Sequence, residues 1–167
     1  MTETQWAETS AAGGDGAVEQ RQRWMHALAL AATEDLAAAW QSWAPKPEVE
    51  AIRGPETGLV MVRSRIDAGG SKFNLGEATV VRATVRLHGG PLAADVLGTS
   101  YVLGTDLEHA RLAAVFDALL ADEALRERVL AEVVAPLEFA QAERDAARRA
   151  DARATLVDFF TVSREHE

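Results

Sequence analysis

Paired arginines are the residues whose type and spacing point most directly to chemistry. Arg82 and Arg86 lie in a segment where apolar and polar residues alternate, so both should project from the polar face of one strand. Arg63 and Arg65 share a strand face in the same way. Because a guanidinium donates a planar fork of hydrogen bonds, such pairs could grip a phosphate-rich ligand or an acidic partner. The competing interpretation is a solvated face whose arginines pair with nearby acids.

The segment Arg53-Gly-Pro-Glu-Thr-Gly58 is the second candidate. On a rigid turn it would present the Glu56 carboxylate and the Thr57 hydroxyl beside Arg53. Its glycines and proline are also what an ordinary hairpin turn requires, so a turn with no further role is the simpler interpretation. The candidates for contact with substrate or partner are therefore Arg53, Glu56, Thr57, Arg82 and Arg86.

Other kinds of site have no support in the residue types. The chain has no cysteine, and its four histidines lack the i,i+3 or i,i+4 pairing of a metal site: His26, His88, His109 and His166. There is no P-loop lysine, and no serine stands in a nucleophile-elbow context. We therefore predict no catalytic residue, no metal site and no cofactor bound by this chain alone.

Charge is distributed unevenly along the 167 residues. The formal net charge is −9, which disfavours nucleic acids and anionic membranes as partners. Six basic and three acidic residues between Arg53 and Arg86 give that segment +3 and leave −12 for the remainder. No apolar run reaches the length of a membrane span, and the first residues lack the pattern of a signal peptide. We expect a cytoplasmic protein.

Periodicity predicts the elements that must position these residues. We expect an α+β fold with N-terminal helices, a mainly antiparallel four-stranded sheet and two or three C-terminal helices. The expected strands cover residues 49–53, 59–66, 79–87 and 95–103, with the turn at 54–58 and a possible bend at Gly98. Thr105 and Glu108 have the spacing of a capping box at the start of the helix that follows.

Three regions are expected along the chain. Residues 1–16 are small and polar and predict a flexible tail, and residues 17–155 form a single α+β domain that includes the C-terminal helix. Residues 156–167 form an apolar partner-docking tail, with the interface residues Leu156, Val157, Phe159 and Phe160. The alternative is that this tail folds back onto its own domain.

Several linked motifs also carry a resemblance to a known family. They are residues 53–60, residues 73–87, Tyr101-Val-Leu-Gly104, Asp106 with His109-Ala110, and Val157-Asp-Phe-Phe-Thr161. In their order and spacing, over about residues 20–164, they resemble the G subunit of the bacterial carbon-phosphorus lyase core complex.

The resemblance implies a non-autonomous subunit of phosphonate metabolism. In that family the G, H and I subunits, with an accessory L subunit, transfer ribose triphosphate from ATP to a phosphonate and release adenine. The displacement is ascribed to the I subunit, and the J subunit of the same core later cleaves the carbon-phosphorus bond. The resemblance therefore implies H, I and J as partners, L as a functional partner, and MgATP as a substrate of the complex.

Two other functions stay open at this point. One is a stand-alone domain that binds an anion or acts as an adaptor through its basic sheet face. The other is a small hydrolase that uses Glu56 and His109.

Overall fold

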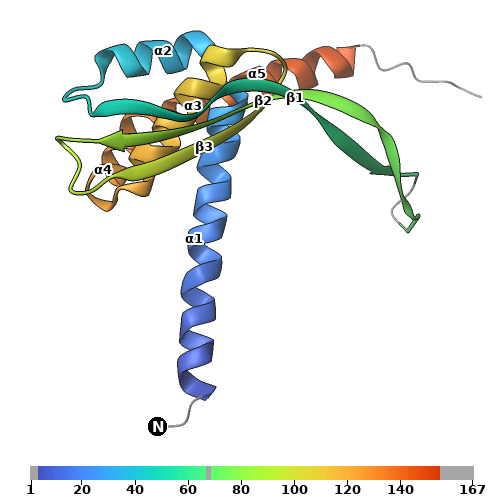
Figure 1. Cartoon of the computed structure of the whole chain (residues 1–167). Coiled ribbons are helices and arrows are strands. Elements are labelled where there is room, and N and C mark those ends of the chain that lie inside the picture. Colours follow the sequence, from blue (N-terminus) through green and yellow to red (C-terminus); the bar gives the residue numbers. More distant parts are fainter. Residues whose placement is uncertain (1–3, 67–68, 155–167) are drawn as a thin grey trace, which may run out of the picture.

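The computed structural model describes residues 4–66 and 69–154, which form an α+β fold. In chain order the elements are α1 (Thr4–Leu30), α2 (Thr33–Ser42), β1 (Glu48–Arg65), β2 (Lys72–His88), β3 (Val96–Leu103), α3 (Leu107–Ala121), α4 (Glu123–Val129), the π-helical turn η1 (Leu130–Val134) and α5 (Ala135–Ala154). α3 packs against all three strands, and α4 and α5 follow it on the same side of the sheet (Figure 1). Among the described helices, none has the length and apolar content needed to cross a bilayer.

The expected four-stranded sheet is wrong, because the described residues form a three-stranded antiparallel sheet in the order β1-β2-β3. The two strands predicted at 49–53 and 59–66 are one strand, β1. The predicted turn between them is extended, with Pro55 opposite Ala83 and Thr57 opposite Val81. Register shifts on either side of Arg53 leave Ile52 and Gly54 as extra residues in β1.

The position of β1 in the sheet explains why this segment does not turn. Pro55 lacks a backbone N–H, and a proline is tolerated in a strand that has a neighbour on one side only. β1 is such an edge strand. The glycine and proline signals therefore produce bulges in a continuous edge strand rather than a hairpin turn.

The core lies between one sheet face and α3. The predicted alternation along β2 is confirmed, because Val81, Ala83, Val85 and Leu87 are buried whereas the arginines between them are half-buried. Opposite them, residues 109–120 of α3 are buried except Arg111, so this helix is the centre of the core.

Gly98 does not bend or bulge its strand, since the register between β2 and β3 is unbroken from Val80 to Leu87. The glycine is instead the point where the backbone of α3 comes closest to the sheet. A Cβ at this position would overlap backbone atoms of Ala114 and Ala118. The residue type at this position is therefore dictated by close approach of a helix.

The cap of α3 also differs from the prediction. The N-cap is Asp106, whose carboxylate accepts a hydrogen bond from the backbone N–H of His109 at 3.0 Å. The hydroxyl of Thr33 donates to the other oxygen at 2.7 Å. Glu108 pairs instead with Arg111. Asp106 thereby joins the start of α2 to the start of α3.

The N-terminal helix begins earlier than the sequence indicated. α1 starts at Thr4, so residues 4–16, expected as part of a tail, are helical. Figure 1 shows this first part extending away from the sheet, whereas Trp24, Ala27 and Leu28 near the other end are buried in the core. The flexibility of the first 16 residues stays a prediction, and the expected docking tail at 156–167 lies outside the described residues.

Candidate functional site

The candidate site is an ion-pair cluster on the sheet face that the helices leave uncovered. We call Arg53, Glu56, Arg82 and Tyr101 the outer cluster. Strand pairing creates it, because Arg82 in β2 lies opposite Glu56 in β1 and opposite Tyr101 in β3. Arg82 Nε donates to Glu56 Oε1 at 2.6 Å, and Arg53 Nε donates to the same oxygen at 2.5 Å. Two guanidinium groups therefore hold one carboxylate.

The electrostatics of the outer cluster follow from these contacts. Hydrogen bonds from Arg53 and then Arg82 lower the pKa of Glu56, because both stabilise its ionised form. Hydrogen bonds with Tyr101 and then Glu56 raise the pKa of Arg82. The three charged side chains of the cluster are between 38% and 54% exposed, so water screens their ion pairs and the cluster contributes little to folding stability.

Arg86 lies beside the outer cluster and has its own acid. Its Nη1 donates to Glu50 Oε2 at 3.0 Å, again between residues that strand pairing places opposite each other. The arginines on this face are thus paired with carboxylates, as the solvated-face interpretation expected. Arg53, Arg82 and Arg86 keep further N–H groups, because a guanidinium has five and one carboxylate does not saturate them.

The other candidates from the sequence do not lie beside the outer cluster. Thr57 follows Glu56 directly and lies opposite the buried Val81, so it points to the other side of the sheet. Arg63 and Arg65 lie beyond the end of β3, in the two-stranded part of the β1–β2 ribbon. The predicted interface residues Leu156, Val157, Phe159 and Phe160 lie outside the described residues.

The hydrolase that would use Glu56 and His109 is wrong. His109 lies in α3 and is 7% exposed, with Nε2 2.8 Å from the carbonyl oxygen of Leu28. Glu56 lies on the opposite, exposed side of the sheet, so no substrate can contact both. Within the described part of the chain, no group of three or more His, Cys, Asp or Glu residues could hold a metal ion.

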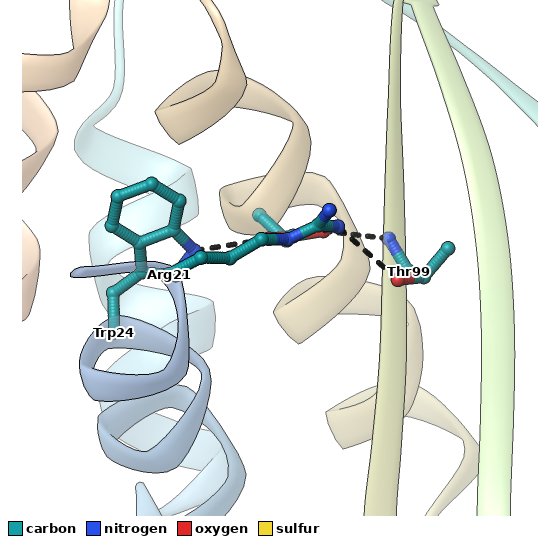
Figure 2. A network of polar contacts seen from close by, with 4 residues as sticks. Arg21, Trp24 and Thr99 are labelled. Atoms are coloured by element: carbon teal, nitrogen blue, oxygen red, sulfur yellow. Dashed lines mark hydrogen bonds and ion pairs between the residues drawn. The ribbon is translucent and has the colours of Figure 1, made fainter. Parts of the chain in front are cut away.

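A buried carboxylate that the sequence analysis missed holds three elements together. Asp117 in α3 is 1% exposed, and Arg21 Nη2 donates to its Oδ2 at 2.7 Å. Trp24 Nε1 donates to Oδ1 at 3.0 Å, and the backbone N–H of Thr99 donates to Oδ2 at 2.9 Å. Figure 2 shows Arg21, Trp24 and Thr99 converging from α1 and β3. In the sequence, Asp117 is the one acid within the otherwise apolar residues 112–120, and this pattern could have indicated a buried carboxylate.

The pKa of Glu56 is the property of the outer cluster that titration can test. A titration followed by the carbon-13 shift of its carboxyl should give a pKa below the usual glutamate value. Arg53→Gln should raise that pKa toward the usual value, because it removes the larger cause. Arg149→Gln, on the exposed surface of α5, is the control and should leave it unchanged.

The sign of the pH dependence follows from the lowered pKa. The ion pairs of Glu56 contribute stability at pH values above its ordinary pKa, and that contribution is lost as the pH falls through the lowered pKa. If Arg53→Gln left the pKa of Glu56 unchanged, the paired arrangement of the outer cluster would be wrong.

Comparison of the sequence with known proteins shows which family it is similar to. A family model described as phosphonate metabolism protein PhnG matches residues 19–165. A protein of Rhizobium meliloti (strain 1021), named alpha-D-ribose 1-methylphosphonate 5-triphosphate synthase subunit PhnG, is 51% identical over 152 residues. The matched region covers 90% of this chain and 92% of that relative.

Proposed function

The chain belongs to the phosphonate metabolism protein PhnG family, and from this premise we propose that it is a subunit of the carbon-phosphorus lyase core complex. In this role it is required for the transfer of ribose triphosphate from ATP to a phosphonate, with release of adenine, and it is not catalytic alone. The observation that carries the proposal is the 51% identity to a synthase subunit over nearly the whole length of both chains.

The reaction sets out what the complex has to provide. A phosphonate oxygen attacks the anomeric carbon of the ribose, and adenine leaves with the electrons of the broken carbon-nitrogen bond and takes up a proton. The attacking oxygen must be aligned with that carbon, and the charge of the triphosphate must be balanced by cations such as arginine and magnesium. MgATP is a substrate of the complex in this proposal, and the chain alone holds no cofactor.

The outer cluster is the part of this chain that we assign to such contacts. Arg53, Arg82 and Arg86 present forked donors on an exposed face, and Glu56 holds two of them in fixed positions. In the assembled complex they contact either the triphosphate or acidic side chains of a neighbouring subunit. The displacement itself belongs to another chain, the I subunit.

The proposed partners are the H, I and J subunits, with the L subunit acting functionally, and the proposed location is the cytoplasm. The apolar segment with Leu156, Val157, Phe159 and Phe160 supplies a further contact with a partner. An apolar segment carrying two adjacent aromatics is the kind of anchor that dominates many interfaces.

Reconstitution tests the proposal. The full chain is combined with the H, I and L subunits, MgATP and methylphosphonate, and released adenine is measured by chromatography. We expect adenine from the complete mixture and none when this chain is omitted or is present alone. Turnover by the isolated chain, or full turnover without it, would overturn the proposal. A monomer that binds phosphate or phosphonate tightly by itself, without joining the other subunits, would support the stand-alone anion-binding function instead.

The same assay tests the outer cluster. Arg82→Gln/Arg86→Gln should lower the rate of adenine release, while Arg149→Gln should not, because Arg149 lies on α5 away from the sheet. The isolated double variant should keep its melting temperature, because exposed ion pairs contribute little stability. An unchanged rate would mean that the arginines are only solvated surface groups.

A further inference from the structure

The β1–β2 ribbon continues past the point where β3 ends, and the part beyond is an arm with two strands only. Pairing between β2 and β3 begins at Val80, opposite Leu103. Residues 59–65 of β1 and 72–79 of β2 therefore pair with each other and have no third strand among the described residues. We call these two segments the arm. Figure 1 shows it projecting away from the helices.

Apolar side chains are exposed on both faces of the arm. Strand alternation places Leu59 and Met61 on one face, where they are 64% and 51% exposed. Val60 and Val62, each 37% exposed, lie on the other face together with Phe73, which pairs opposite Ser64. A two-stranded ribbon of this kind is only marginally stable in water. An exposed apolar surface on both sides is therefore typical of a segment that another molecule encloses.

The charge of the arm indicates the charge of the surface that it contacts. Arg63 and Arg65 lie on the face of Leu59 and Met61, and Lys72 pairs opposite Arg65 near the tip. Residues 59–78 carry three basic and two acidic side chains, in a chain with a net charge of −9. The face that meets this tip should therefore be acidic.

We propose that the arm inserts into an apolar cleft of another subunit of the same synthase complex, with acidic side chains facing Arg63, Arg65 and Lys72. The inference rests on the proposed function, because it assumes that the chain joins a multi-subunit enzyme. A cleft is required rather than a flat surface, since a flat surface would cover only one of the two apolar faces.

Two other occupants fit the arm less well. In a lipid bilayer the open backbone edges of a two-stranded ribbon would stay without hydrogen-bond partners, which is strongly unfavourable. Symmetric pairing of two arms from two copies of this chain would cover only one of the two apolar faces of each arm.

The test uses the full chain with one pair of substitutions on each face of the arm. Leu59→Ser/Met61→Ser removes the apolar groups of one face, and Val60→Thr/Val62→Thr those of the other while keeping the β-branched shape. The matched control is Leu107→Ser/Phe139→Ser, because these apolar side chains are exposed to a similar extent, at 45% and 67%, and lie on α3 and α5 rather than on the outer face of the sheet. Each protein is titrated against the other synthase subunits, and the apparent Kd of assembly is measured.

We expect each arm variant to raise the apparent Kd about tenfold or more, as loss of central apolar contacts does in other interfaces. The control should not change it. Arg63→Gln/Lys72→Gln should weaken assembly and reduce its dependence on salt. The melting temperature of each isolated variant should stay near that of the unsubstituted chain, because all these side chains are exposed.

The possible failures are distinguishable. If the unsubstituted chain does not assemble with the other subunits, the proposed function is wrong. If it assembles and the arm variants assemble equally well, the arm inference is wrong while the proposed function stands. If the variants of only one face weakened assembly, the proposal that a cleft encloses both faces of the arm would be wrong. A self-associated chain that the arm variants convert to monomers would overturn the choice of partner, as would binding to phosphatidylserine vesicles that the arm variants abolish.

Discussion

Asp117→Ala should lower the free energy of unfolding by about 3–5 kcal/mol, because it removes the acceptor of a buried hydrogen-bond network. Trp24 Nε1 and the backbone N–H of Thr99 would lose their partner in the core, and buried donors without acceptors are costly. Arg21 contributes less to this loss, since its side chain is 48% exposed and can turn to water. For a domain of this size the melting temperature should fall by roughly 10 °C.

Denaturant unfolding, followed by the fluorescence of the tryptophans and by circular dichroism, measures this loss. Asp95→Ala is the control, because Asp95 is an exposed acid just before β3. Asp117→Asn should lie between the control and Asp117→Ala, since an amide keeps one acceptor oxygen and turns an N–H group toward the donors. Equal stability of Asp117→Ala and the control would mean that the network does not hold α1 on the sheet.

Gly98→Ala should destabilise the protein by about 3 kcal/mol or more, an unusually large effect for one methyl group. The added Cβ would overlap the carbonyl oxygen of Ala114 and the backbone nitrogen of Ala118, and would lie 2.7 Å from Ala118 Cβ. These are backbone atoms of the most buried helix, so they cannot move aside as the end of a flexible side chain can. Either α3 shifts from the sheet or β3 distorts.

Gly58→Ala is the matched control, since this glycine lies in the same sheet and a Cβ there would meet nothing within 4 Å. Its free energy of unfolding should change by no more than about 0.5 kcal/mol. Comparison of the two midpoints in urea separates the close approach of α3 from the general cost of replacing a strand glycine. Equal midpoints would show that α3 does not pack as closely on Gly98 as the structure indicates.

The elements that could be predicted are those whose information is local. Alternating residues in β2 identified both its buried and its polar face, since a strand repeats every two residues. The capping-box spacing of Thr105 and Glu108 identified the start of α3, although the N-cap proved to be Asp106. The linked motifs identified the family, and with it the proposed function.

The predictions that failed depended on contacts between distant parts of the chain. Residues 54–58 form part of a strand rather than a turn because β2 pairs with them, and the residues of this segment alone do not indicate that pairing. The charge of the basic segment was summed over consecutive residues from Arg53 to Arg86. Glu50 precedes that segment and was not included, although the register of β1 and β2 places it opposite Arg86, where the two form an ion pair.

The sequence by itself determined the residue types, the family and the two faces of β2, because these follow from composition, from the linked motifs and from the two-residue period of a strand. Only the tertiary structure decided which charges are paired, why position 98 is a glycine, and that β3 ends before the β1–β2 ribbon does. The tertiary structure alone also decided that Asp117 is buried among hydrogen-bond donors from α1 and β3. Each of these depends on distances between residues far apart in the chain, and such distances exist only once the chain has folded.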